Sequence, residues 1–286
     1  MSATSTAAVA GGTEPRRAHS PLGHRIRRRL GANVLRVYGV LAFAYLFTPV
    51  AYVTVFSFND GGKSNIVWHG FTLGNWADPC GAADVCSAVG NSLKIGVLST
   101  LIATVLGTMI AFALGRHRFR GRTATNLLIF MPMATPEVVL AASLLTLFLN
   151  LGISLGFWTI VLAHVMFSIS FVVVAVKARV AGLDPRLEQA AMDLYANEFE
   201  TFRRVTFPLV APGIAGAALL AFSLSFDDYI ITTFNSGAES TFPKFVYVAA
   251  QRGIPAQAYV VGAAMFFIAL SVVLAGEFAR RRRSPK

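Results

Sequence analysis

The chain has 286 residues, of which 55% are hydrophobic and only 14% charged. A soluble domain usually carries about a quarter charged residues, so the composition excludes an ordinary soluble protein. The net charge of +11 does not indicate a nucleic-acid partner, because the basic residues lie between apolar blocks instead of along one folded surface.

Residues 1–32 are predicted to be a disordered, basic segment, since up to Pro21 they are rich in Ala, Ser, Thr and Gly without apolar periodicity. The first apolar block begins too late and is too long for a cleaved signal peptide. Six apolar blocks follow, each about the 20 residues that cross a hydrocarbon core: Val34–Phe56, Leu93–Leu114, Asn126–Leu149, Leu155–Val176, Gly213–Phe234 and Ala256–Ala275.

In lipid, each backbone N–H and C=O must be paired within its own segment, so these blocks are predicted to be helices. The expected fold class is an all-α integral membrane protein with six transmembrane helices. We divide it into a first transmembrane helix at 33–58, a five-helix transmembrane domain at 91–276 and a basic tail at 277–286.

The basic residues also predict the orientation. All Lys and Arg except Lys63, Lys94, Lys244 and Arg252 lie on one side of the six blocks. By the positive-inside rule that side is cytoplasmic, which places both termini in the cytoplasm. Cys80 and Cys86 then lie in an external loop, where they either form a structural disulfide or remain two free thiols.

Between the fourth and fifth blocks, residues 184–212 are too polar to cross a membrane. Asp184 and Pro185 are typical of a helix start, and a turn is expected near Tyr195. A second short helix is predicted from Glu198 to Val205, and Pro208 and Pro212 should end it. Two short helices with small and charged side chains suit a groove in a soluble partner better than a membrane surface.

This segment resembles the EAA loop of type I ATP-binding-cassette (ABC) importer permeases, through the run from Leu187 to Ala196 followed by Phe207-Pro208 and Pro212. The likeness extends over about residues 91–275. Stretches 131–138 and 224–229 are similar to the spermidine/putrescine permease branch. The family implies a coupling helix that contacts the ATPase through Glu188, Gln189, Ala190, Ala191, Asp193, Leu194 and Tyr195.

Two residues depart from the family pattern. Gln189 replaces the usual Glu, and Tyr195 replaces a Gly. Because a bulky residue resists positive φ, Asn197 is expected to take the turn instead.

The resemblance implies transport by alternating access in the plasma (inner) membrane of a prokaryote. Its expected partners are a cytoplasmic ABC ATPase dimer, a second homologous permease subunit and an extracytoplasmic substrate-binding protein. The chain shows no nucleotide-binding motif, because Gly61-Gly62-Lys63-Ser64 lacks the earlier Gly of a phosphate loop and is predicted to lie outside. It is therefore expected to be a transport subunit without catalytic residues, a metal or a cofactor.

Three acids fall within the predicted spans. Glu137 is expected near the middle of the third span, and Asp227 and Asp228 in the outer half of the fifth. A carboxylate at mid-membrane costs about 2.5–3.5 kcal/mol on insertion scales, so such residues face a cavity or a partner. Together with Tyr229 they are predicted to line a cation path, which favours a polyamine. The alternative is that they are protonated or paired structural groups.

The predicted spans also contain other polar residues and prolines. Ser225, Asp228 and Thr232 would form one stripe on a continuous helix. Pro132 and Pro136 should kink the third span, either beside the path or only for packing. His164 is interpreted as a packed, hydrogen-bonded side chain in preference to a proton relay.

Two other function classes are weighed. A membrane enzyme would need a nucleophile–base or metal constellation, which the five His and two Cys do not form in sequence. A secondary transporter would usually contain internal repeats and would leave the 184–212 loop without a role. A permease for another small solute remains the main alternative.

Overall fold

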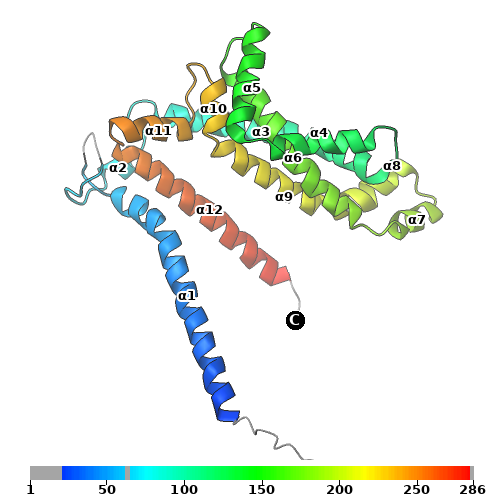
Figure 1. Ribbon diagram of the computed structural model, residues 1–286, viewed down its shortest axis with the longest axis horizontal. Helices are drawn as coiled ribbons and strands as arrows, with labels where there is room; N and C mark the ends of the chain where they lie inside the picture. Colours follow the sequence, from blue (N-terminus) through cyan, green and yellow to red (C-terminus); the bar gives the residue numbers. More distant parts are fainter. Residues whose placement is uncertain (1–20, 62–64, 284–286) are drawn as a thin grey trace, which may run out of the picture. The chain divides into compact units, whose positions relative to one another are not determined.

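The computed structural model describes residues 21–61 and 65–283. These residues form helices and loops, with one isolated antiparallel bridge between Asn59 and Phe71 (Figure 1). The chain divides into two units, residues 1–53 and 54–286. Five helices are long and apolar enough to span a membrane, or six if one bent pair counts as a span. The expected all-α membrane fold is confirmed.

The first unit consists of most of helix α1 (Pro21–Phe56), whose apolar part runs from Asn33 to Phe56. Residues 21–32, predicted to be disordered, are helical, consistent with the high helix propensity of their Arg and Leu residues. Residues 1–20 lie outside the described residues. The apolar stretch is not buried within the chain, as expected for a helix that faces lipid or another subunit.

The centre of the second unit is formed by α3 (Val85–Arg116), α6 (Phe157–Ala181) and α9 (Phe207–Phe226). Small residues on α3 let the helices approach closely, as is common in membranes. Ala103, Gly107 and Ala111 are buried at every fourth position. They meet branched side chains of α6, including Val172 and Val176.

Two predicted spans are not continuous helices. The third is divided into α4 (Arg122–Ala134) and α5 (Glu137–Asn150), which are bent by 107°. Pro136 has no N–H and forces Thr135 into the extended conformation, so the expected kink is a complete break. The fifth span ends at Phe226, and the short α10 (Ile230–Asn235) follows. The prediction of one helix through Phe234 was therefore wrong.

At one end of the core, α2 (Gly74–Ala77), α11 (Phe242–Arg252) and the start of α12 (Ala256–Arg283) come together. Cys80 and Cys86 form a disulfide there, with Cα atoms 5.4 Å apart. The opposite end carries α7 (Arg186–Asp193), α8 (Glu198–Thr201) and the π-helical turn η1 (Phe202–Thr206). The disulfide loop and the α7 loop are therefore separated by the length of α3.

Close packing of α3 on α6 gives a stability prediction. A Cβ at Gly107 would lie 2.7 Å from Val172 Cγ1, whereas one at Gly90 of the same helix meets nothing within 4 Å. Gly107→Ala should lower stability, because overpacking costs about 1–3 kcal/mol. Gly90→Ala should retain or raise stability through about 1 kcal/mol of helix propensity. Thermal unfolding in detergent measures both, and equal midpoints would contradict the packing.

Candidate functional site

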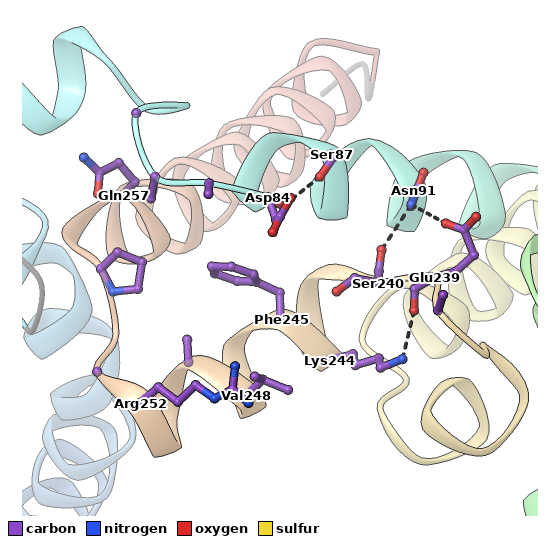
Figure 2. A pocket seen from close by; sticks show the side chains of 17 residues that line it. Asp84, Ser87, Asn91, Glu239, Ser240, Lys244, Phe245, Val248, Arg252 and Gln257 are labelled. Atoms are coloured by element: carbon purple, nitrogen blue, oxygen red, sulfur yellow. Dashed lines mark hydrogen bonds between the residues drawn. The ribbon is translucent and has the colours of Figure 1, made fainter.

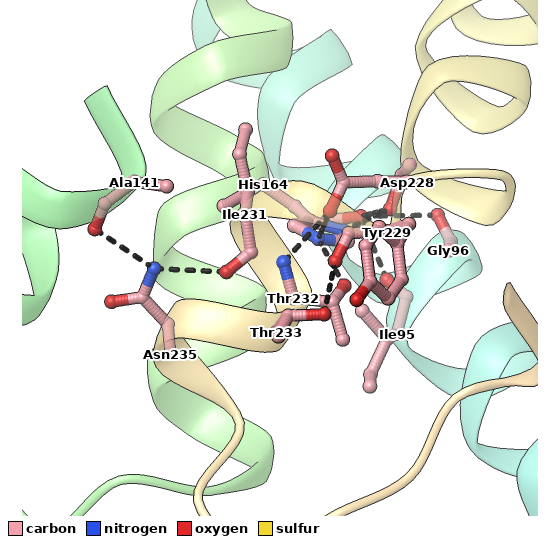
Figure 3. Close-up of polar contacts among 12 residues, drawn as sticks. Ile95, Gly96, Ala141, His164, Asp228, Tyr229, Ile231, Thr232, Thr233 and Asn235 are labelled. Atoms are coloured by element: carbon pink, nitrogen blue, oxygen red, sulfur yellow. Dashed lines mark hydrogen bonds and ion pairs between the residues drawn. The ribbon is translucent and has the colours of Figure 1, made fainter. Parts of the chain in front are cut away.

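A buried polar cluster surrounds His164, in the first half of α6 (Figure 3). Only 2% of His164 is exposed. Its Nδ1 lies 2.7 Å from Ser225 Oγ, and its Nε2 lies 3.1 Å from Thr232 Oγ1 and 3.3 Å from Asp228 Oδ1. One imidazole thus joins α6 to the end of α9, to the following loop and to α10.

Further hydrogen bonds fasten the break between α9 and α10. Asp228 Oδ1 accepts from the Thr232 backbone N–H at 2.8 Å, and the Ser225 hydroxyl lies 2.8 Å from that of Ser99 on α3. The Asn235 amide donates to the carbonyls of Ile231 and Ala141. The break is therefore held from α3, α5 and α6.

The acids come together where the two broken spans meet. Glu137 is the first residue of α5, a position that a helix dipole favours for an acid, and its carboxyl lies close to that of Asp228. Asp228 is 7% exposed, whereas the neighbouring Asp227 is exposed. Asp227 therefore presents a carboxylate that another molecule can reach.

The placement of these residues needs correction. Asp227 and Asp228, predicted in the outer half of the fifth span, lie in the loop after α9. Asp228 also has an unpredicted partner in His164. His164 precedes Asp228 by 64 residues, so no local sequence pattern indicated that contact. Ser225, Asp228 and Thr232 do share one site, but they converge on His164 through a bent backbone.

Tyr229, also predicted to line the path, is half-buried beside the acids. Its ring packs against that of Tyr247 in α11, with centroids 4.4 Å apart and the rings tilted by 32°. Within the described residues, no group of three or more His, Cys, Asp or Glu side chains is arranged to hold a metal ion.

The loop around α7 forms a second site at the opposite end of the core. The Asp184 carboxylate accepts from the Arg186 backbone N–H at 2.9 Å, which caps α7. Tyr195 has a φ of 65° and makes the turn itself. The expectation that Asn197 would take this turn was wrong. Asn197 instead caps α8 by accepting from the Glu200 backbone N–H.

The second short helix does not stop at the prolines. Residues Glu198–Phe226 run continuously through α8, η1 and α9. Pro208 is the second residue after the π-turn. The π-turn changes the pattern of backbone hydrogen bonds, so the helix can continue although proline has no N–H to donate. Pro212 lies inside α9. The second short helix and α9 are therefore one helical unit.

The predicted ATPase contacts differ in accessibility. Glu188 points back into the protein, where it binds Arg116 and Thr206. Ala191 is half-buried. The remaining predicted contacts are exposed: Gln189, Ala190, Asp193, Leu194 and Tyr195. The partner of Glu188 was missed because Arg116 is 72 residues away in the chain.

A third feature is a hollow of about 880 Å³ between the start of α3, the α10–α11 loop and α11 (Figure 2). Asn91 donates to Glu239 and to the Ser240 carbonyl. Lys244 donates to Ser236 Oγ and to the carbonyls of Gly237 and Glu239, and burial lowers the pKa of its ammonium group. These bonds give the loop beside the hollow a fixed form.

The described residues thus form an α-helical membrane bundle with a short, exposed helical loop at one end. Residues 103–283 match the model of a family described as binding-protein-dependent transport system inner membrane components. The chain belongs to this family and is a membrane-spanning subunit of an ABC importer.

Curated relatives are similar over most of the chain. The spermidine/putrescine transport system permease protein PotC of Escherichia coli K12 is 35% identical over 243 residues, covering 85% of this chain and 92% of the relative. The putrescine transport system permease protein PotI of the same strain is 36% identical over 224 residues, covering 75% and 79%.

Solved structures share the fold. A permease chain of a bacterial ABC transporter that imports alginate gives a TM-score of 0.63 at 17% identity, covering 92% of this chain and 98% of that one. The alginate transporter in complex with its periplasmic protein gives 0.65 at 16% identity, covering 91% and 96%. At these identities the likeness shows the fold alone.

Proposed function

We propose that the chain forms, with a second homologous permease subunit, a pathway through which a polyamine such as spermidine or putrescine enters the cell. The observation that carries this proposal is the exposed Asp227 carboxylate, which lies beside Asp228 where two broken spans meet. The relatives named for spermidine and putrescine support the same substrate class. A permease for another small solute is the alternative.

The physical reason is the cost of moving a multiply charged cation through a low-dielectric bundle. A polyamine loses hydration there, and carboxylates offset that loss better than hydroxyls or amides do. Non-helical backbone at membrane depth is tolerated where it lines a water-filled cavity or is buried in protein. Asp227 suits a position that lines a cavity, and Asp228 suits a position buried in protein. We therefore assign contact with the solute to Asp227 and support of the loop to Asp228. Tyr229 can add a cation–π contact.

The energy for transport comes from a cytoplasmic ABC ATPase dimer that binds the α7 loop. The exposed residues Leu194, Tyr195 and Phe199 give this loop a projecting apolar tip, and apolar anchors of this kind dominate interface energies. Movement of the ATPase would then drive alternating access. A secondary transporter would have no use for such a tip.

In this arrangement the α7 side, with both termini and the Arg-rich loops, is cytoplasmic. The opposite end, with the disulfide and the hollow beside Lys244, faces outward to a substrate-binding protein. The alginate importer in complex with its periplasmic protein supports such a partner.

Docking of the ATPase is tested at Ala190, which is exposed on α7. Ala190→Arg should prevent close approach and reduce ATPase co-purification at least about tenfold, equivalent to 1.4 kcal/mol. Ala124→Arg, at an exposed position on α4, is the matched control. Normal ATPase recovery with Ala190→Arg would remove α7 from the interface.

Orientation is tested by thiol labelling of right-side-out spheroplasts. After reduction, a membrane-impermeant maleimide should label Cys80 and Cys86 before lysis. A variant with both cysteines replaced by serine gives the background. Labelling that requires lysis would invert the topology and place α7 outside.

The acids are tested by measuring assembly and polyamine uptake together. Asp227→Asn should assemble normally and lower uptake about tenfold or more, since a charged contact contributes about 1.5–3 kcal/mol. Asp228→Asn retains an acceptor for the Thr232 N–H but loses the charge that faces His164. It should mainly reduce the amount of assembled protein, because a buried polar group that loses a hydrogen-bond partner costs about 1–3 kcal/mol.

Glu137→Gln completes the series and should lower uptake. If all three variants assemble and carry polyamine at the wild-type rate, the acids do not form a cation path. The substrate assignment would then rest on the relatives alone.

A further inference from the structure

An acidic side chain of helix α7 binds the membrane core at two points. The helix has eight residues, and none of them is buried. Glu188 forms a two-bond ion pair with Arg116 in the last turn of α3, at 2.5 and 2.6 Å. The Thr206 hydroxyl donates to the same carboxylate at 2.5 Å. One carboxylate therefore ties α7 both to α3 and to the π-turn before α9.

A hollow of about 570 Å³ lies beside this ion pair and is lined by Arg116 and Glu188 together with Phe112, Met192 and Phe202. Interiors are normally packed without such gaps, so apolar packing is incomplete on this side of the pair. On its other side the pair lies near Leu183, Leu187 and Leu209. The charged pair is therefore one of the contacts that fix the position of α7.

The pair is largely shielded from water, which strengthens the attraction between its two charges. The side chains of Arg116 and Glu188 are 24% and 21% exposed. Forked Arg–carboxylate bonds also fix geometry as well as distance. Such a link resists both separation and rotation of its two helices.

The elements that receive the link belong to the core. Leu114, in the same last turn of α3 as Arg116, is buried against α6 and α9. Thr206 is 3% exposed and closes the π-turn, in which the Phe207 N–H bonds to the Phe202 carbonyl. π-turns are frequent at functional sites. A displacement of α7 would thus reach α3 and α9 together.

We propose that the Glu188–Arg116 pair, with Thr206 as its third partner, transmits movement of α7 to α3 and α9. It would thereby couple ATP hydrolysis to transport without forming the ATPase contact itself. This inference rests on the proposed docking of the ATPase to α7. Glu188 and Arg116 are positioning residues in this scheme.

The test uses the assembled importer, purified through a tag on this chain and reconstituted in proteoliposomes with its binding protein. It compares Glu188→Arg, Arg116→Glu, the double exchange and the conservative Glu188→Gln. Three quantities are measured: ATPase recovered, ATP hydrolysed and spermidine taken up. Each single reversal should retain the ATPase but lower uptake per ATP about tenfold, and the exchange should restore most of it, as expected for directly coupled residues.

The control is Arg118→Glu, a charge reversal at an exposed position two residues after Arg116. It should leave all three quantities unchanged. If reversals at 116 and 188 leave uptake per ATP unchanged, or if the exchange restores nothing, the inference is wrong. It is also wrong if the reversals release the ATPase, since the pair would then build the docking surface. If a charge-reversal variant does not fold, Glu188→Gln takes its place in the test. Normal uptake per ATP in Glu188→Gln would then overturn the inference. Failure of the wild-type chain to retain an ATPase would instead overturn the proposed function.

Discussion

Backbone groups at membrane depth need partners within the protein, since hydrocarbon offers none, and the arrangement of this chain follows from that requirement. Two spans are broken, one at Thr135-Pro136 and one after Phe226. Each break leaves N–H and C=O groups without helical partners. The breaks are placed against each other, and side chains supply the bonds, as Asp228 does for the Thr232 N–H. Polar residues gather at this point because the backbone there requires them, and the same concentration of polar groups suits a charged solute.

The two neighbouring aspartates differ in their surroundings. Asp228 is buried against His164 and accepts a backbone hydrogen bond, so its carboxylate already has partners within the chain. Asp227 is exposed, and another molecule can reach its carboxylate. In the pathway that we propose, the buried acid would hold the loop that presents the exposed one in a defined position.

Periodicity and composition predicted much of this architecture: the apolar blocks, the short α7 helix and the family all follow from residues close together in the chain. The third span was expected to kink at Pro136 but not to break, and the fifth was predicted to continue as helix past Asp227, because a hydropathy pattern records burial and not backbone direction. The contacts of His164 with Asp228 and of Arg116 with Glu188 join residues 64 and 72 positions apart. No local pattern encodes such pairs. Tyr195 also showed that a bulky residue can hold a positive φ, although the left-handed region costs about 1–2 kcal/mol.

Helix α9 connects the two sites. Its 20 residues correspond to about 30 Å at 1.5 Å per residue. The π-turn and Thr206 precede its first residue, and Ser225 and Asp227 lie at its last turn. Because a packed helix moves as a rigid body more readily than it bends, a shift received from Glu188 at one end would be delivered at the other end to Asp227. The His164 cluster would then be the point where α9 moves relative to α6, with hydroxyl and imidazole groups that can exchange partners as the helices slide. A buried apolar contact at the same place would have no such second arrangement, which gives a physical reason for placing polar side chains at the break.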